Sequence, residues 1–285
     1  MNTGCDAEPR LEGGAVELFR ILESLPDRPT AFVKYRDLYG SEVDVPAAPP
    51  KPFDGRDFVR WPAGSRMFFE GVNQFRTTFT DFAAAQWGLT ETDLAAWGCR
   101  WAISGPAAWR IVIPVTMGGR PVGWQARSVM NAVPKYLTSR YGKESDPEAQ
   151  CGRPASAMLF NADALPEGGE ALVLEGAANA MAWHRRDRAR TPVAVALLGV
   201  ALTQEKAALL GARRLERIVV ALDDEPAARR RGRRHAEGLR AWVSAEVVAG
   251  RWVGGKDLGS GARLEIEESE PDILDRVRSR LGKDN

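Results

Sequence analysis

The stretch Ala171-Leu-Val-Leu-Glu175-Gly176 places an acidic residue directly after a short apolar run. The same arrangement recurs where Asp223-Asp224-Glu225 follows Ile218-Val-Val-Ala-Leu222, and where Lys256-Asp257 follows Trp252-Val-Gly-Gly255. Short apolar runs that alternate with helical stretches are typical of parallel strands. Because the carboxyl ends of parallel strands meet at one edge of an open sheet, we expect these carboxylates to converge there. Converging oxygen ligands predict a site for Mg²⁺ or Mn²⁺.

The alternation of strand and helix is regular from about residue 168 onward. Strands are predicted at 171–174, 193–198, 217–222 and 247–252, with helices at 177–186, from a Thr203 cap to about 213, and at 227–243. This order predicts an α/β fold with a parallel four-stranded sheet flanked by helices. A last helix is predicted from a Ser269 cap to a stop at Gly282.

The pattern upstream is a mixed α+β one. One or two helices are predicted between Phe82 and Trp97, around Gly88 and with Thr90 as an N-cap. The runs 109–115 and 121–127 flank Gly118-Gly119, which predicts a β-hairpin. Further upstream we expect a helix at 15–25, a strand pair at 30–39 and an extended Pro-rich linker at 47–53.

Basic residues gather in this upstream part of the chain. They are Arg100, Arg110, Arg120, Arg127, Lys135, Arg140, Lys143 and Arg153. They form either a solvated positive face or a track for a phosphate backbone. Trp124, beside the basic strand, is a candidate for base stacking. The arginine-rich run 229–235 lies on the outer face of a helix and is either a soluble face, the favoured interpretation, or a DNA contact.

Composition limits the possible classes of protein. The 285 residues are 44% hydrophobic and carry a formal net charge of +1, so net charge indicates no partner. Three scattered cysteines without a CxxC pair predict no zinc site and a reducing, cytoplasmic environment. The sequence contains no GxxxxGK[ST] motif, so we expect no fused helicase motor. The polar N-terminus and the lack of a long apolar run predict neither a signal peptide nor a membrane span.

Several motifs resemble those of DnaG-type primases, whose catalytic core contains a TOPRIM domain. Glu175-Gly176 followed by Asn179 resembles the TOPRIM glutamate motif, Asp223-Asp224-Glu225 the Asp-x-Asp motif, and Lys256-Asp257 the closing Lys-Asp. Four upstream stretches resemble, in the same order, the basic N-terminal subdomain of these cores: Ile111–Pro114, Gly123–Arg127, Pro134–Ser139 and Leu159–Asn161. The resemblance covers about residues 75–262, and its seven motifs occur in the family's order.

The resemblance implies four parts of the chain. They are an N-terminal arm of unclear role with the Pro-rich linker (1–57), a basic N-terminal primase-core lobe (58–165), a TOPRIM domain (166–262) and a C-terminal helix (263–285). It implies a minimal core of the kind that a phage or mobile element encodes, without zinc-binding or helicase domains. For a phage-encoded protein the site of action is the host cytoplasm.

The resemblance also implies an activity and its residues. The expected enzyme is a nucleotidyltransferase of the DNA-directed RNA polymerase type, a DNA primase that makes short primers in DNA replication by two-metal nucleotidyl transfer. Catalysis and metal binding are assigned to Glu175, Asp223, Glu225 and Asp257, and nucleotide or template binding to Arg127, Lys135, Tyr136 and Lys256. The expected cofactor is Mg²⁺ or Mn²⁺. The expected partners are single-stranded DNA, nucleoside triphosphates and a separate replicative helicase.

The chain departs from the family pattern at three positions. Asn179 stands where the glutamate motif has Asp, Glu225 replaces the second Asp of Asp-x-Asp, and Leu258 replaces an acid after Lys-Asp. These changes weaken the negative field on the metals, although Asp224 offers a further carboxylate. Lower metal affinity, a preference for Mn²⁺ and loss of catalysis all stay open. The alternatives are a catalytically weakened TOPRIM module that binds single-stranded DNA and recruits a partner, and a TOPRIM nuclease.

Overall fold

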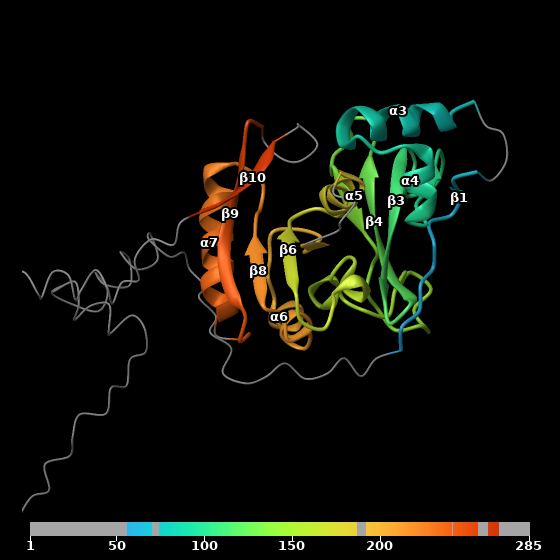
Figure 1. Cartoon of the computed structure of the whole chain (residues 1–285). Coiled ribbons are helices and arrows are strands. Elements are labelled where there is room, and N and C mark those ends of the chain that lie inside the picture. The colour runs from blue at the N-terminus through green and yellow to red at the C-terminus, as the bar shows by residue number, and fades with distance from the viewer. Residues whose placement is uncertain (1–55, 70–73, 187–191, 241, 256–261, 268–285) are drawn as a thin grey trace, which may run out of the picture. The chain divides into compact units, whose positions relative to one another are not determined.

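The computed structural model describes residues 56–69, 74–186, 192–240, 242–255 and 262–267, which all belong to one unit, Ala47–Asn285 (Figure 1). We call residues 56–165 the N-terminal lobe and residues 166–267 the C-terminal lobe; each contains one five-stranded sheet. The elements predicted at 15–25, 30–39, 47–53 and 269–282 lie outside the described residues, as do Lys256 and Asp257.

The N-terminal lobe is built on an antiparallel sheet in the order β1-β2-β3-β4-β5. Its strands are β1 (Ser65–Met67), β2 (Arg100–Ala102), β3 (Arg110–Met117), β4 (Arg120–Ser128) and β5 (Tyr136–Thr138). The predicted hairpin is confirmed between β3 and β4, where Gly118 and Gly119 have φ of 62° and 72°. The two glycine amides donate to the Asp163 carboxylate at 2.6 and 2.9 Å. This turn ties the hairpin to the segment that leads into the C-terminal lobe.

Two helices cover the N-terminal sheet, as predicted. They are α3 (Arg76–Trp87) and α4 (Glu91–Ala96). Gly88 ends α3 in the left-handed conformation at φ 65°, which glycine adopts without steric cost. The Thr90 hydroxyl accepts a hydrogen bond from the Asp93 amide, and the Asp93 carboxylate accepts one from the Thr90 amide. This reciprocal capping box starts α4 where the sequence predicted.

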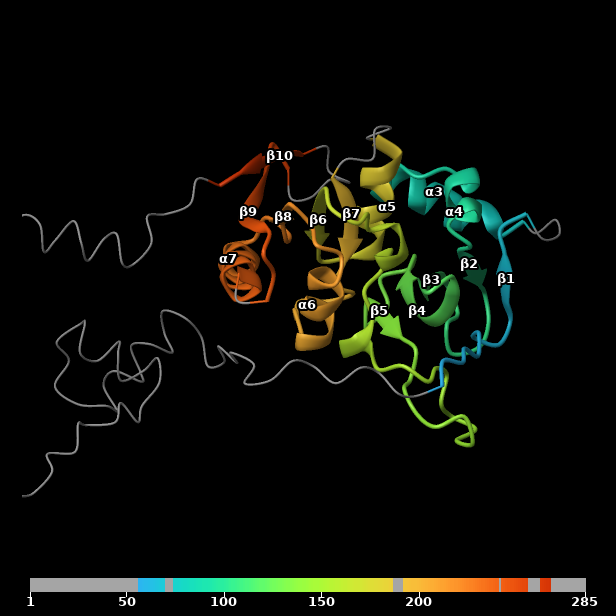
Figure 2. The ribbon, with the colours of Figure 1, turned by 60° about the horizontal axis from the view of Figure 1, so that its bottom comes forward.

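The C-terminal lobe contains the predicted parallel strands and helices (Figure 1). In chain order they are β6 (Glu170–Leu174), α5 (Ala177–Arg186), β7 (Val193–Ala196), α6 (Gln204–Gly211), β8 (Arg217–Val220), α7 (Pro226–Arg240) and β9 (Glu246–Val253). Leu172 and Leu174 pack on the α5 side, and Ala171 and Val173 pack with α6 and α7. Figure 2 shows α5 on the opposite side of the sheet from α6 and α7. Both faces of the sheet are thus buried, as expected for parallel strands.

One strand of this sheet was not predicted. Residues Arg263–Ile266, which we assigned to a C-terminal helical segment, form strand β10, antiparallel to β9 at the edge of a sheet in the order β10-β9-β8-β6-β7. Leu264 pairs with Trp252 across the two strands. The sheet therefore has five strands in place of four, and it extends beyond the predicted domain boundary at residue 262. No helix of the described residues is long and apolar enough to cross a membrane.

The two lobes share one hydrophobic core. It includes Phe79 and Trp101 of the N-terminal lobe together with Leu172, Met181 and Trp252 of the C-terminal lobe, all at most 2% exposed. The short 3₁₀ helices η1 (Ala155–Ala157) and η2 (Ala162–Ala164) belong to the segment that joins the lobes. This continuous packing sets the position of one lobe relative to the other.

Candidate active site between the lobes

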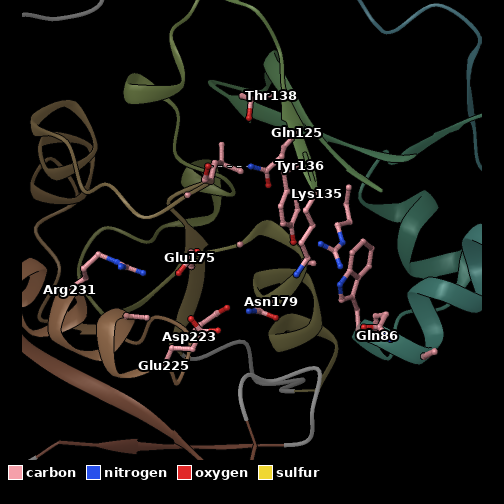
Figure 3. A pocket seen from close by; sticks show the side chains of 18 residues that line it. Gln86, Gln125, Lys135, Tyr136, Thr138, Glu175, Asn179, Asp223, Glu225 and Arg231 are labelled. Carbon is pink, nitrogen blue, oxygen red and sulfur yellow. Dashed lines mark hydrogen bonds between the residues drawn. The ribbon is translucent and has the colours of Figure 1, made fainter. Parts of the chain in front are cut away.

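A cavity of about 780 Å³ lies between the two lobes (Figure 3). The end of α3, strand β4 and residues 135–138 form its wall in the N-terminal lobe. The opposite wall consists of the turn after β6, the start of α5, the loop after β7, the segment after β8 and the start of α7. The charged residues on the lining are Glu175, Asp223, Glu225, Arg127, Lys135 and Arg231.

The predicted acids reach this cavity from two neighbouring strands. Glu175 follows β6 and Asp223 follows β8, and these strands are parallel neighbours with Val173 beside Val220. Asp223 and Glu175 are half-buried and Glu225 is exposed. The structure thus brings Glu175 to the same cavity as Asp223 and Glu225, which lie far from it in the sequence, as expected from parallel-strand geometry. Asp257 and Lys256, the remaining predicted residues of this lobe, lie outside the described residues.

Asp224 does not belong to this group of acids. Its carboxylate lies 2.6 Å from Nε of Arg229, and it is not on the cavity lining. Adjacent residues after a strand point to different sides, which explains why Asp223 and Glu225 share the cavity while Asp224 does not. The idea that Asp224 supplies a further carboxylate to the site is therefore not supported by its position.

The loop from Leu197 to Ala201 borders the cavity and is held by side chains of α6 and β4. Lys206 of α6 donates to the Leu197 and Ala201 carbonyls at 2.6 and 3.2 Å. Gln125 of β4 donates to the Leu198 carbonyl at 3.2 Å, which links the two lobes. Burial lowers the pKa of Lys206 to about 8. The loop is thus fixed by buried polar contacts that sequence patterns did not reveal.

Arg127 is the central cation of the N-terminal wall. Its guanidinium carbon lies 5.0 Å from the Tyr136 ring centroid and 5.6 Å from that of Phe82. Its Nε and Nη1 atoms are buried and have no hydrogen-bond partner among the described residues. Burial lowers the pKa of Arg127, and the nearby Tyr136 opposes this shift. Two aromatic rings therefore hold a charged group on the cavity lining, where its positive charge can attract an anion.

Most of the other basic residues of the N-terminal lobe are not part of the site. Of the eight in the predicted track, only Arg127 and Lys135 line the cavity. Arg110 is 5% exposed and donates to the Pro134 and Lys135 carbonyls at 2.8 and 3.1 Å. Arg110 thus positions the backbone of Lys135 instead of facing a ligand. Arg153 pairs with Asp57 at 2.9 Å.

Trp124 is a core residue and not a stacking platform. Its side chain is 2% exposed, and its Nε1 donates to the Arg60 carbonyl at 3.1 Å. The prediction of base stacking at this position is therefore wrong. Tyr136, which was also predicted to contact nucleotide or template, does lie on the cavity lining.

Gln125 and Arg231 are two of the lining residues that were not assigned to the site from the sequence. Gln125 lies two positions before Arg127 on β4, and alternate residues of a strand share a face. Arg231 lies three positions after Ala228 on α7, and residues at this spacing share a helix face. Both spacings are present in the sequence, but they indicate a lining residue only once the position of the cavity is known.

The donor chemistry of the cavity fits a divalent ion. Glu175, Asp223 and Glu225 offer hard carboxylate oxygens on one lining. Among the described residues, no three metal-ligating side chains gather closely enough to hold an ion by themselves. Mg²⁺ typically binds one or two carboxylates and completes its shell with water and substrate phosphates. The described acids therefore suit an ion that arrives with a phosphate ligand.

Comparisons with known proteins identify the fold. Residues 172–259 match a family model described as Toprim-like. A structure of the DnaG primase catalytic domain bound to single-stranded DNA is similar at a TM-score of 0.51 and 17% identity, over 74% of this chain and 73% of that chain. The E. coli primase catalytic core is similar at a TM-score of 0.52 and 18% identity, over 66% of this chain and 69% of that chain. No curated protein shows significant sequence similarity to this chain.

The described residues thus form a two-lobed α/β protein with a Toprim-like C-terminal lobe. A second structure, of the DnaG catalytic core, agrees at a TM-score of 0.52 over 74% of both chains. The fold is that of a DnaG-type TOPRIM primase core, which confirms the fold predicted from the sequence motifs.

Proposed function

We propose that this chain is a nucleotidyltransferase that makes short primers from nucleoside triphosphates on a single-stranded DNA template. One observation carries the proposal. The three acids of the C-terminal lobe line the same cavity as Arg127, Lys135 and Tyr136 of the N-terminal lobe (Figure 3). Primer synthesis needs both sets of groups, since acids bind divalent ions and the basic and aromatic groups bind phosphates and bases.

The chemistry to be supported is an in-line displacement at phosphorus. A 3′-hydroxyl oxygen forms a bond to the α-phosphate of the incoming nucleotide, the bond to the β-phosphate breaks, and pyrophosphate leaves. Divalent ions bound by Asp223, Glu225 and Glu175 would stabilise the charge on the attacking and leaving oxygens. Glu175, half-buried at the end of β6, is also placed to accept the proton of the hydroxyl.

The N-terminal wall supplies recognition of the substrate. Lys135 is exposed at the cavity and acts as a flexible positive charge toward phosphate. Arg127 adds a guanidinium fork held between Tyr136 and Phe82. Tyr136 offers a ring face on which a template or substrate base can stack. A separate replicative helicase as partner stays a prediction.

The test is primer synthesis with matched carboxylate variants. The protein is incubated with single-stranded DNA, labelled NTPs or dNTPs, and Mg²⁺ or Mn²⁺, and the products are separated on a denaturing gel. Asp223→Asn and Glu175→Gln should lower product formation by at least about 100-fold, as expected for groups that act in the transition state. Asp224→Asn is the control, because Asp224 pairs with Arg229 outside the cavity. Failure of the wild type with every template and metal, or full activity of Asp223→Asn, would overturn the proposal.

A binding and recruitment module is the second candidate. It is favoured by the neutral Asn179 on the cavity lining and by the lack of a three-ligand cluster among the described residues. This alternative predicts salt-sensitive binding of single-stranded DNA that persists in Glu175→Gln and needs no divalent ion. Loss of DNA binding on chelation would argue against it.

A further inference from the structure

Arg231 is a cation on the wall of the cavity opposite Arg127 and Lys135. It belongs to α7 of the C-terminal lobe and lines the cavity one helical turn after Ala228. In Figure 3 the side chains of Arg231 and Lys135 reach into the cavity from opposite sides, with Glu175 and Asp223 between them. The acids are thus flanked by positive charge from both lobes.

The Nε atom of Arg231 differs from that of its neighbours on α7. Nε of Arg229 lies 2.6 Å from the Asp224 carboxylate, and Nε of Arg233 donates to Glu267 at 2.7 Å. Nε of Arg231 is buried and has no hydrogen-bond partner among the described residues. A buried donor without an acceptor is unfavourable, and Arg231 lines the cavity, so a change of its side-chain rotamer toward a bound anion would give this donor an acceptor.

The chemistry of the cavity restricts what this ligand is. A guanidinium presents its donors in a fixed fork that matches phosphate oxygens. A phosphate can also bridge Arg231 to a divalent ion on the neighbouring carboxylates, whereas a protein acid would add only repulsion. The half-buried position of Arg231 on the lining suits the compact end of a small molecule, whereas the exposed Lys135 suits a continuous strand.

We infer that Arg231 binds the terminal phosphates of the incoming nucleoside triphosphate, the part that leaves as pyrophosphate. This inference rests on the proposed function and adds a substrate-binding residue in the C-terminal lobe. In this arrangement Arg127, Lys135 and Tyr136 hold the nucleotide and template from one side. Arg231 holds the leaving group from the other side and stabilises the negative charge that it gains as the bond to the α-phosphate breaks.

The test measures binding directly, with inorganic tripolyphosphate and ATP as probes in the presence of Mg²⁺. Titration calorimetry compares the wild type with Arg231→Met, Arg231→Lys and the control Arg230→Met, which changes the adjacent exposed arginine outside the cavity lining. Arg231→Met should weaken both probes by about 10- to 100-fold, the range for loss of charged hydrogen bonds. Arg230→Met should bind as the wild type. Single-stranded DNA binding, followed by fluorescence anisotropy, should be unchanged in all three variants.

Other outcomes overturn the inference. Wild-type affinity of Arg231→Met for tripolyphosphate would do so, as would a loss confined to DNA binding, which would assign Arg231 to a strand phosphate. No binding of either probe to the wild type would also contradict it. If Arg231→Met does not fold, the affinity of Arg231→Lys for tripolyphosphate is measured instead. This variant keeps the positive charge but lacks the two-pronged guanidinium group. Its affinity for tripolyphosphate should fall several-fold, and unchanged affinity would refute the role of the fork.

The two proposals fail in different ways. If the wild type binds tripolyphosphate through Arg231 but makes no oligonucleotide, the primase proposal fails and the phosphate site stands. If the wild type makes primers and Arg231→Met does so with an unchanged KM for NTP, the Arg231 inference fails and the primase proposal stands.

Discussion

Lys206 offers a test of the structure that requires no activity. Its side chain is 4% exposed, and its ammonium group donates to two carbonyls of the loop that borders the cavity. Burial lowers the pKa of Lys206 from 10.5 to about 8, against a smaller opposing effect of Glu205. We predict that Lys206→Met changes how the stability of the protein depends on pH, more clearly than it changes the stability at pH 7.

The magnitude at neutral pH involves opposing contributions. The buried Leu197 carbonyl left without a donor costs about 1–3 kcal/mol, and removal of the buried charge of Lys206 stabilises the fold by about 3 kcal/mol. These opposing contributions largely cancel at pH 7. The pH dependence is clearer, because the folded pKa lies below the unfolded one. Between about pH 8 and pH 10.5 the unfolded chain binds a proton that the folded chain does not, so rising pH stabilises the fold.

Denaturant titrations at several pH values measure this contribution. The difference in free energy of unfolding between wild type and Lys206→Met should grow by about 1 kcal/mol from pH 7 to pH 9. Other groups titrate in the same range, but they are common to both proteins and cancel in the difference. Lys143→Met, a change at an exposed lysine, is the control and should give a flat difference. If the free energy of unfolding depends on pH in the same way for wild type and Lys206→Met, the lowered pKa of the buried Lys206 is refuted.

Four further changes test the walls of the cavity, the loop beside it and the cap of helix α4. Arg127→Met should weaken binding of ATP and of single-stranded DNA by about 10-fold or more, measured by calorimetry and anisotropy, because a buried guanidinium is lost. Gln125→Leu should lower the free energy of unfolding by about 1–3 kcal/mol in denaturant titrations, since the buried Leu198 carbonyl loses its donor. Thr90→Ala should cost about 1 kcal/mol in the same titrations through loss of a helix cap, and Thr90→Ser should cost less. Asn179→Asp should tighten Mn²⁺ binding about 10-fold in calorimetry, because it adds a carboxylate to the cavity; unchanged affinity would speak against an ion there.

The sequence predicted most of the C-terminal lobe because its strands and helices repeat a strong pattern. Residues Ala171–Leu174 are apolar on both faces, which indicates a strand buried on both sides. Arg263–Ile266 was missed because four residues that alternate charged and apolar are too short to separate strand from helix, and pairing with β9 decides their structure. The start of α3 at Arg76 was missed because its N-cap, Phe75, makes no side-chain cap hydrogen bond.

The site was predictable only in part, because the order of the elements determines which acids converge but not which cations face the cavity. Glu175 and Asp223 converge because β6 and β8 are parallel neighbours, and this follows from the order of elements. The identity of the cations does not follow from order. Arg110 and Arg127 lie on adjacent strands, yet Arg110 is engaged by two backbone carbonyls and Arg127 faces the cavity. Arg231 lies in a run of arginines for which the sequence favoured a solvated helix face over a DNA contact, and neither interpretation singles out Arg231.

The balance of charge on the lining has a consequence for how ligands enter. Among the described residues, three acids and three cations line the cavity, so the formal charges of these six side chains cancel. A divalent ion alone meets the repulsion of nearby arginine and lysine, and a triphosphate alone meets the repulsion of the carboxylates. Together the two ligands neutralise each other and satisfy both sets of side chains. We therefore expect each ligand to tighten the binding of the other, and by linkage the factor must be the same in both directions. Under the proposed function, a site of mixed charge would thus favour the metal–nucleotide complex over either component alone.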